Sequence, residues 1–195
     1  MPVTVAQAFG SVRRVTMITM RRFMSILLAC AAVVAVQAAP ALADAQDSLQ
    51  ATIARSAGAD KARRYAPLLR AAARKHGVPE LLVAGIIRQE SDWDPTCRTG
   101  PSRGLMQVNR GHARRGDNLF DPKTNLDYGC RILREYRDWA ARRMPKGSPE
   151  RAIWHKALTA YNFGPIAVAH RGLYRSRYSA KVMRSYEQAS DAPRR

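Results

Sequence analysis

Apolar residues recur at helical spacing through most of the chain, and this periodicity is the strongest constraint on its fold. The clearest case follows Asp121 and Pro122, where Leu126, Gly129 and Leu133 repeat every three or four residues. Asp121 suits the N-cap of this helix, and proline suits its first position. No segment alternates apolar and polar residues for long enough to predict more than a trivial strand. The pattern therefore predicts an all-α domain with at most a trivial β element.

The same periodicity, with Gly and Pro as punctuation, gives the expected organisation of the chain. Helices are predicted at 65–76, 79–91, 105–109, 122–144, 150–162, 166–170 and 179–189, with Pro67 in the first turn of the first helix and a basic loop at 111–118. The 195 residues suit one domain, which we place at 61–190. Residues 44–60 are interpreted as a loosely attached polar leader, with a partly helical structure left open, and 191–195 as a basic tail.

The first 43 residues are typical of a secretory signal peptide. Arg21 and Arg22 precede an apolar run at 23–36, and a small-residue cleavage site ends at Ala43. The run is too short for a membrane span, so none is expected in the mature chain. Translation starting further downstream and lipidation at Cys30 remain alternatives. The expected location is the periplasm or the cell exterior.

Removal of the signal peptide leaves two cysteines, Cys97 and Cys130. Two cysteines in an exported chain predict a disulfide between them. The alternative is a buried free thiol at Cys130 and an unpaired thiol at Cys97.

The charge balance indicates a polyanionic partner. The chain holds 33 Lys and Arg against 15 Asp and Glu, a net charge of +18, and removal of the four arginines of the signal peptide leaves +14. Such a charge favours nucleic acid or an anionic surface outside the cytoplasm. The basic residues are spread along the sequence and do not form one arm, so nucleic acid is not expected.

Glu90 is the candidate for chemistry. It continues the apolar stripe of Leu82 and Ile86, so it projects from the face that packs. Burial and the negative end of the helix dipole both favour the neutral carboxyl, which predicts a raised pKa and a general acid. The alternative is a Glu at a frayed helix end that points to water.

Four strings occur in a fixed order in this chain: QES at 89–91, GLMQV at 104–108, NLFDPKTNLDYGCRIL at 118–133 and ALTAYNFGP at 157–165. In this order and spacing they resemble the lytic transglycosylase domain with a lysozyme-like fold. The resemblance covers about 65–186. It implies peptidoglycan as the substrate, Glu90 as the acid and later the base, and no cofactor.

The resemblance also implies substrate-binding residues: Ser91, Gln107, Asn109, Tyr161, Asn162 and Tyr178. Ser91 could instead bond a backbone carbonyl, and Tyr178 could simply pack in the last helix. Asn109 departs from the family pattern, where methionine is frequent. The four histidines are isolated in the sequence, so no metal site is expected.

The implied reaction cleaves the β-1,4 bond between N-acetylmuramic acid and N-acetylglucosamine and leaves 1,6-anhydromuramic acid ends. Two alternatives remain: a goose-type-lysozyme-like hydrolase, for which only Asp92 and Asp94 lie near Glu90 in the sequence, and a non-catalytic basic module that binds cell wall or nucleic acid. The chain also resembles small family members that serve secretion or conjugation machines.

Overall fold

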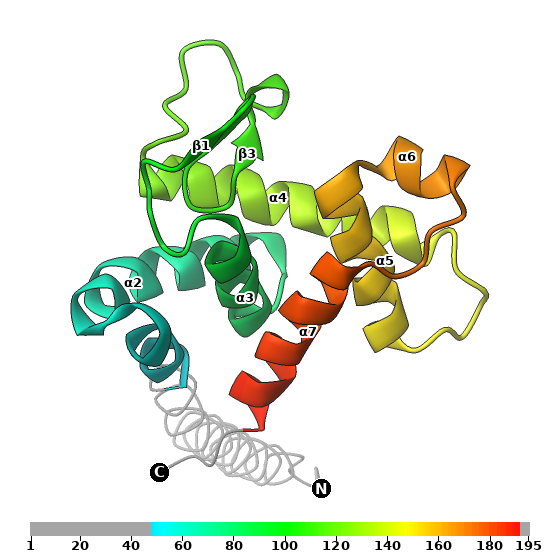
Figure 1. Cartoon of the computed structure of the whole chain (residues 1–195), viewed down its shortest axis with the longest axis horizontal. Helices are drawn as coiled ribbons and strands as arrows, with labels where there is room; N and C mark the ends of the chain where they lie inside the picture. The colour runs from blue at the N-terminus through cyan, green and yellow to red at the C-terminus, as the bar shows by residue number, and fades with distance from the viewer. Residues whose placement is uncertain (1–47, 192–195) are drawn as a thin grey trace, which may run out of the picture. The chain divides into compact units, whose positions relative to one another are not determined.

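The computed structural model describes residues 48–191, which form a helical domain with one very small sheet (Figure 1). The helices are α2 (Ala59–His76), α3 (Glu80–Glu90), α4 (Pro122–Ala141), α5 (Glu150–Phe163), α6 (Pro165–His170) and α7 (Arg177–Ser190), and a 3₁₀ turn covers Arg110–His112. The all-α prediction is confirmed. The predicted signal peptide, Cys30 and residues 192–195 lie outside the described residues.

The helix ends follow the local signals in the sequence. The carboxylate of Asp121 accepts a hydrogen bond from the backbone N–H of Thr124 at 2.8 Å, which caps α4. Gly77 ends α2 with a φ of 64°, a left-handed conformation that glycine adopts without steric cost. Gly164 ends α5 with a φ of 82°. Caps therefore set where α4 begins and where α2 and α5 end.

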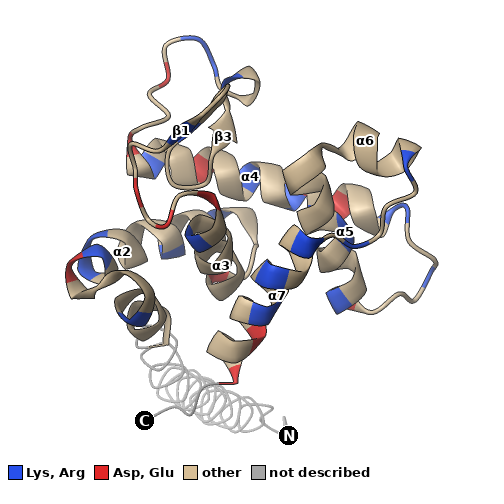
Figure 2. Cartoon of the chain, viewed as in Figure 1, with Lys and Arg blue, Asp and Glu red and all other residues tan. Residues whose placement is uncertain are grey.

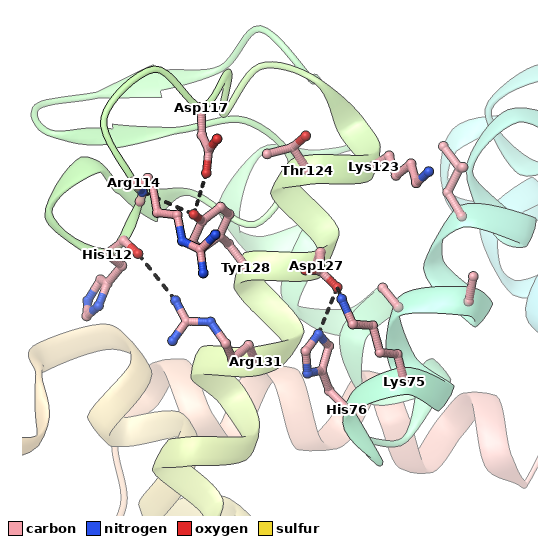
Figure 3. Close-up of a pocket in the computed structure, with 14 residues that line it drawn as sticks. Lys75, His76, His112, Arg114, Asp117, Lys123, Thr124, Asp127, Tyr128 and Arg131 are labelled. Atoms are coloured by element: carbon pink, nitrogen blue, oxygen red, sulfur yellow. Dashed lines mark hydrogen bonds and ion pairs between the residues drawn. The ribbon is translucent and has the colours of Figure 1, made fainter.

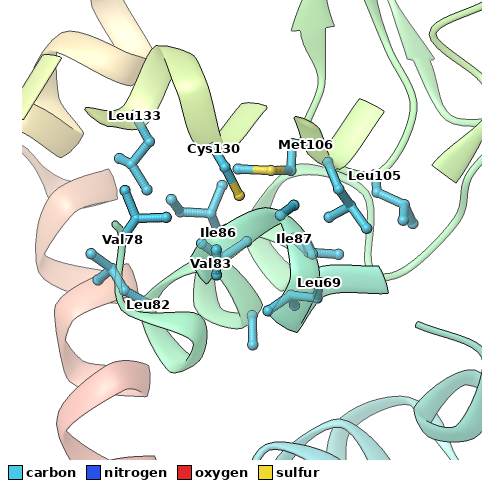
Figure 4. Packing of buried hydrophobic residues seen from close by; sticks show 14 of the residues in the cluster. Leu69, Val78, Leu82, Val83, Ile86, Ile87, Leu105, Met106, Cys130 and Leu133 are labelled. Atoms are coloured by element: carbon cyan, nitrogen blue, oxygen red, sulfur yellow. The ribbon is translucent and has the colours of Figure 1, made fainter. Parts of the chain in front are cut away.

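Helix α3 lies in the hydrophobic core (Figure 4). The side chains of Leu82, Val83, Ile86 and Ile87 are fully buried. Figure 4 shows Cys130 of α4 close to these residues. Burying one such aliphatic side chain stabilises the fold by about 1.5–3 kcal/mol, so the position of α3 is firmly set.

Helix α7 packs against both α3 and α5, while α4 packs against α2 and α5. These contacts bring the last helix of the domain beside the central helix, although about ninety residues separate them in the chain. The C-terminal end of α3 therefore meets side chains from distant parts of the sequence. No helix among residues 48–191 has the length and apolar character that crossing a membrane requires.

The sheet consists of three two-residue strands, β1 (Arg98–Thr99), β2 (Ser102–Arg103) and β3 (Val108–Asn109), paired antiparallel in this order. The prediction of a trivial β element is confirmed. The helix predicted at 105–109 is wrong, because residues 104–107 form turns and the next two residues form β3. Gly104 and Gln107 both have positive φ values, 74° and 47°, which a right-handed helix cannot contain.

The segment before α2 is attached more firmly than the leader that we expected, and it is helical, a possibility that the sequence left open. Residues 48–57 are helical, and Leu49 and Ile53 are fully buried in the same core as α3. Two buried apolar side chains at i and i+4 attach this helical segment to the core. Helix α2 also begins earlier than predicted, so Pro67 lies inside it and not in its first turn.

Gly129 on α4 provides a test of this packing. A Cβ atom at this position would lie 2.3 Å from Sδ and 2.9 Å from Cβ of Met106. We therefore expect Gly129→Ala to lower the free energy of unfolding by about 1–3 kcal/mol through overpacking, measured by urea denaturation. In Gly111→Ala the added Cβ would be 3.4 Å from Asn109, an ordinary contact, so stability should stay within about 0.5 kcal/mol of wild type. Equal stability of the two variants would contradict the packing described.

Candidate active site

Glu90 is the last residue of α3, and its carboxylate meets a tyrosine from the far end of the chain. The hydroxyl of Tyr178 donates a hydrogen bond to Oε1 of Glu90 at 2.6 Å. Tyr178 lies in the first turn of α7, where Ser176 and Ser179 form a reciprocal capping box. The capping box fixes the start of α7 and therefore the position of the tyrosine.

The environment of Glu90 shifts its pKa in two opposing ways. Burial raises the pKa of the carboxyl group, because the charged form loses hydration. The hydrogen bond from Tyr178 lowers the pKa, because it stabilises the carboxylate, but burial has the larger effect. The carboxyl group therefore holds its proton at a higher pH than an exposed glutamate does. When it loses this proton, the hydroxyl of Tyr178 donates a hydrogen bond to the resulting carboxylate.

The chain turns sharply after Glu90 and Ser91. Asp92 and Trp93 both have positive φ values, 48° and 65°, which are uncommon for residues with side chains. The indole of Trp93 is fully buried and stacks on Tyr65 of α2, with the ring centroids 6.2 Å apart. Sequence reasoning missed Trp93 as the anchor of this turn. A large aromatic residue directly after a predicted helix end was the available signal.

The two acidic residues of this turn point to solvent. Asp92 is exposed. Asp94 is also exposed, and its Oδ1 accepts hydrogen bonds from the side-chain hydroxyl of Thr96 at 2.7 Å and its backbone N–H at 2.8 Å. These two bonds lower the pKa of Asp94. Its carboxylate is thus committed to the local turn.

A fully buried amide, that of Asn125 on α4, shapes the 104–107 segment. Its Nδ2 donates to the carbonyl oxygens of Arg103 and Leu119 at 2.7 and 2.8 Å, and its Oδ1 accepts from the N–H of Met106 at 2.8 Å. A Cβ atom on Gly104 would lie 2.4 Å from both Nδ2 of Asn125 and the oxygen of Leu119, so only glycine fits there. Asn125 was not predicted as a site residue.

Ser91 and Tyr161 hold the same segment from its other side. The hydroxyl of Ser91 donates to the carbonyl oxygen of Leu105 at 2.8 Å, and that of Tyr161 donates to the oxygen of Met106 at 2.9 Å. Both predicted substrate-binding residues therefore use their hydroxyl hydrogens on the protein backbone. For Ser91 this geometry matches the alternative that we kept open, a bond to a backbone carbonyl.

Gln107 has its amide oriented by the backbone. Its Nε2 donates to the carbonyl oxygens of Cys97 and Gly104, each at 3.0 Å. Because two acceptors fix the nitrogen, Oε1 must point the other way, and this buried oxygen has no hydrogen-bond partner in the described part of the chain. The Oε1 atom of Gln107 therefore remains as a hydrogen-bond acceptor for a ligand.

A cavity of about 300 Å³ brings four of the predicted substrate-binding residues together: Gln107, Asn109, Tyr161 and Asn162. Tyr136 and Phe163, which were not predicted, also line it. Glu90, Ser91 and Tyr178 are outside this lining. Glu90 is nonetheless connected to this lining through two neighbouring residues: Ser91, which follows Glu90, binds the carbonyl oxygen of Leu105, and Tyr161 of the lining binds that of Met106.

The predicted disulfide is wrong in this structure, where Cys97 and Cys130 are both free thiols. Cys130 is buried in the core near Met106 (Figure 4), and burial, with the charge of Asp127, raises the pKa of its thiol to about 12. Sγ of Cys97 lies 3.9 Å from the carbonyl oxygen of Glu90.

Within residues 48–191 we find no group of three or more His, Cys, Asp or Glu side chains arranged to hold a metal ion.

Residues 67–183 match the protein family described as the transglycosylase SLT domain. The chain belongs to this family. The match agrees with the resemblance that the sequence motifs indicate at 65–186, and it contains Glu90 and every predicted substrate-binding residue.

Relatives of this SLT domain include the membrane-bound lytic murein transglycosylase C of Yersinia enterocolitica, which is 30% identical over 122 residues, 55% of this chain and 33% of the relative. The protein of the same name from Histophilus somni is 34% identical over 122 residues, with the same coverage. That from Haemophilus influenzae is 33% identical over 87 residues, 37% of this chain and 24% of the relative. The chain spans a third or less of the length of these relatives.

The raised pKa of Glu90 predicts a pH-dependent effect on the stability of the SLT domain. Because the folded state binds this proton more tightly than the unfolded state, Glu90 favours folding at low pH and loses this contribution as pH rises through the folded pKa. Glu90→Gln should therefore be more stable than wild type at pH 7. The difference should shrink below about pH 4, where the wild-type carboxyl is protonated in both states.

Urea denaturation at pH 7 and pH 3.5 measures this difference. Glu150→Gln is the control, since that carboxylate is exposed and pairs with Arg137. It should stay within about 1 kcal/mol of wild type at both pH values. A Glu90→Gln protein that is less stable than wild type at pH 7 would mean that the charged form of Glu90 is favoured in the fold.

Proposed function

We propose that this chain is a peptidoglycan lytic transglycosylase. The observation that carries the proposal is the geometry of Glu90: a partly buried carboxyl group with a raised pKa, at the end of a packed helix, with Tyr178 donating to it. Membership of the SLT domain family and relatives named as lytic murein transglycosylases support it. A protonated carboxyl beside a cavity with polar lining is what cleavage of a glycosidic bond needs.

In the proposed reaction, the protonated carboxyl of Glu90 gives its proton to the oxygen that links N-acetylmuramic acid to N-acetylglucosamine. The bond from this oxygen to the anomeric carbon of the muramic acid breaks. The hydrogen bond from Tyr178 stabilises the carboxylate that Glu90 becomes. This carboxylate then takes the proton of the muramyl 6-hydroxyl, whose oxygen bonds to the anomeric carbon and closes the 1,6-anhydro ring. Glu90 regains its proton, and no water is consumed.

Gln107 supports an N-acetylated sugar as the ligand of the adjacent cavity. Its buried Oε1 has no partner in the described part of the chain and suits the N–H of an acetamido group or a sugar hydroxyl. Tyr136 and Phe163 line the same cavity, and aromatic rings offer flat apolar surface to sugar rings. An amide acceptor beside aromatic side chains is a suitable combination for an amino sugar.

The positions of Asp92 and Asp94 favour transglycosylation over hydrolysis. Glycoside hydrolases commonly use a second carboxylate, as a base for water or as a nucleophile. Asp92 is exposed, and Asp94 is bound to Thr96. With one carboxyl group in place, the tethered hydroxyl of the substrate is the better nucleophile, because it needs no positioned water.

The surface charge supports a dispersed anionic partner. Figure 2 shows Lys and Arg spread over α2, α4, α5 and α7. Peptidoglycan with its peptide carboxylates meets this requirement without the single basic face that duplex nucleic acid needs. We include two further points in this proposal. Residues 1–43 direct export to the periplasm or beyond, and the enzyme serves a wall-spanning secretion or conjugation machine.

Digestion of purified sacculi in heavy-oxygen water tests the reaction. Mass analysis of the released muropeptides should show 1,6-anhydromuramic acid ends without the heavy oxygen. Glu90→Gln should lower the rate at least about a hundredfold, the contribution typical of a general acid. Glu150→Gln, which changes an exposed carboxylate that pairs with Arg137, should keep wild-type activity.

Three results would overturn this proposal. Heavy oxygen in the muramyl products, lost in Asp92→Asn or Asp94→Asn, would identify a hydrolase. Full activity of Glu90→Gln would place the acid elsewhere. Binding to sacculi without any cleavage by the wild-type chain would identify a wall-binding module.

Tyr178→Phe tests the hydrogen bond to Glu90. Because this bond lowers the pKa of Glu90, its removal should raise that pKa and move the alkaline limb of the kcat/KM profile to higher pH. The rate should also fall about tenfold, since the carboxylate loses a donor worth about 1.5 kcal/mol or more. Tyr186→Phe, on the same helix, is the control and should match wild type. An alkaline limb that moves to lower pH would contradict the assigned role.

A further inference from the structure

A second cavity, of about 980 Å³, lies between α2, α4 and the loop that follows the 3₁₀ turn (Figure 3). Its lining contains none of the groups that the proposed reaction uses. Four cationic side chains border it: Lys75 from α2, Arg114 from the loop, and Lys123 and Arg131 from α4. A volume of this size suits a ligand much larger than a single inorganic ion.

The cations of this cavity differ in how far they are already neutralised. The ammonium group of Lys75 pairs with Asp127 at 2.7 Å, and the guanidinium of Arg131 pairs with Glu135 at 2.6 Å. Within residues 48–191, the side chains of Arg114 and Lys123 form no hydrogen bond or salt bridge, and Lys123 acts only through its charge on the nearby carboxylate of Asp121. These two cations are therefore available to anionic groups of a ligand.

The remaining lining adds a carboxylate and an apolar wall. The carboxylate of Asp117 accepts a hydrogen bond from the hydroxyl of Tyr128, which in turn accepts from the backbone N–H of Arg114 (Figure 3). The side chains of Leu68, Ala71 and Ala72 contribute small apolar groups from α2. The cavity thus combines two available cations, one carboxylate that forms no salt bridge within the described residues, that of Asp117, and space for small aliphatic side chains.

We propose that this cavity binds the stem peptide of peptidoglycan. A stem peptide carries free carboxylates for Arg114 and Lys123, an amino group for Asp117, and alanine methyl groups for the apolar wall. His112 lines both this cavity and the one that holds Gln107, so the two sites adjoin. The inference rests on the proposed function, because it assumes that a glycan strand lies in the neighbouring cavity.

Duplex nucleic acid fits these observations less well. The cavity is concave, and Asp117 and Asp127 in its lining would face a phosphate backbone. A peptide that carries an amino group beside its carboxylates, with alanine side chains, matches both the shape and the charges.

The first test measures binding without catalysis. The full chain is titrated with the soluble stem tetrapeptide, and the dissociation constant is compared for wild type and two double variants. Arg114→Gln with Lys123→Gln should weaken binding about tenfold or more, the loss of one or two charge-assisted hydrogen bonds. Arg142→Gln with Lys146→Gln removes the same charges in the turn after α4 and should leave binding unchanged. An acidic tetrapeptide with ordinary α-peptide bonds serves as a second probe. It tests whether the cavity recognises the stem peptide itself or any acidic peptide.

The second test compares two substrates, intact sacculi and glycan strands freed of peptide by an amidase. Arg114→Gln with Lys123→Gln should raise KM about tenfold on intact sacculi and leave the peptide-free strands unaffected. An equal rise in KM on both substrates, or no rise on either, would overturn the stem-peptide site. Tighter binding of the α-linked peptide than of the stem tetrapeptide in the first test would also overturn it. A wild-type chain that binds the tetrapeptide through Arg114 and Lys123 but releases no anhydro ends would overturn the proposed reaction and keep this site.

Discussion

The candidate active site depends on one buried amide, that of Asn125. It joins the backbone of Arg103, Met106 and Leu119 to α4, using both of its donors and its acceptor. Because these backbone groups lie in the protein interior, removing the amide would leave each of them unpaired, at a cost of about 1–3 kcal/mol per group. The 104–107 segment can adopt turns with positive φ values only because its hydrogen bonds are satisfied in this way.

That fixed segment in turn positions the end of α3. Ser91 binds it directly after Glu90, and Tyr161 binds it from α5. Glu90 is thus held in a partly buried place where its charged form is disfavoured, with Tyr178 limiting the penalty. Burial of the C-terminal end of α3 has two effects. It stabilises the helix through packing, and it destabilises the charged form of Glu90. A general acid at this site would therefore come at a cost in stability near neutral pH.

Helix α4 separates two different environments. Asp127, Tyr128 and Arg131 line the large cationic cavity, whereas Ile132 and Tyr136 line the smaller cavity next to Glu90. Residues three or four apart share a face of a helix, so a shift of one residue is enough to change the cavity that a side chain meets. One helix can therefore present a charged surface and a sugar-sized polar cavity on adjacent faces.

The sequence by itself determined most of the helices, the helix ends marked by Gly77, Asp121 and Gly164, and the position of Glu90 at the end of an apolar stripe, because these features depend on residues a few positions apart. It also indicated the family, through motifs that hold their order. Only the tertiary structure decided that Tyr178 would reach Glu90, that the 104–107 segment would form turns, and that the two cysteines of the domain would stay unpaired. These outcomes depend on how α4 and α7 pack against α3, and such long-range contacts follow from shape and burial across the whole core, which local periodicity does not encode.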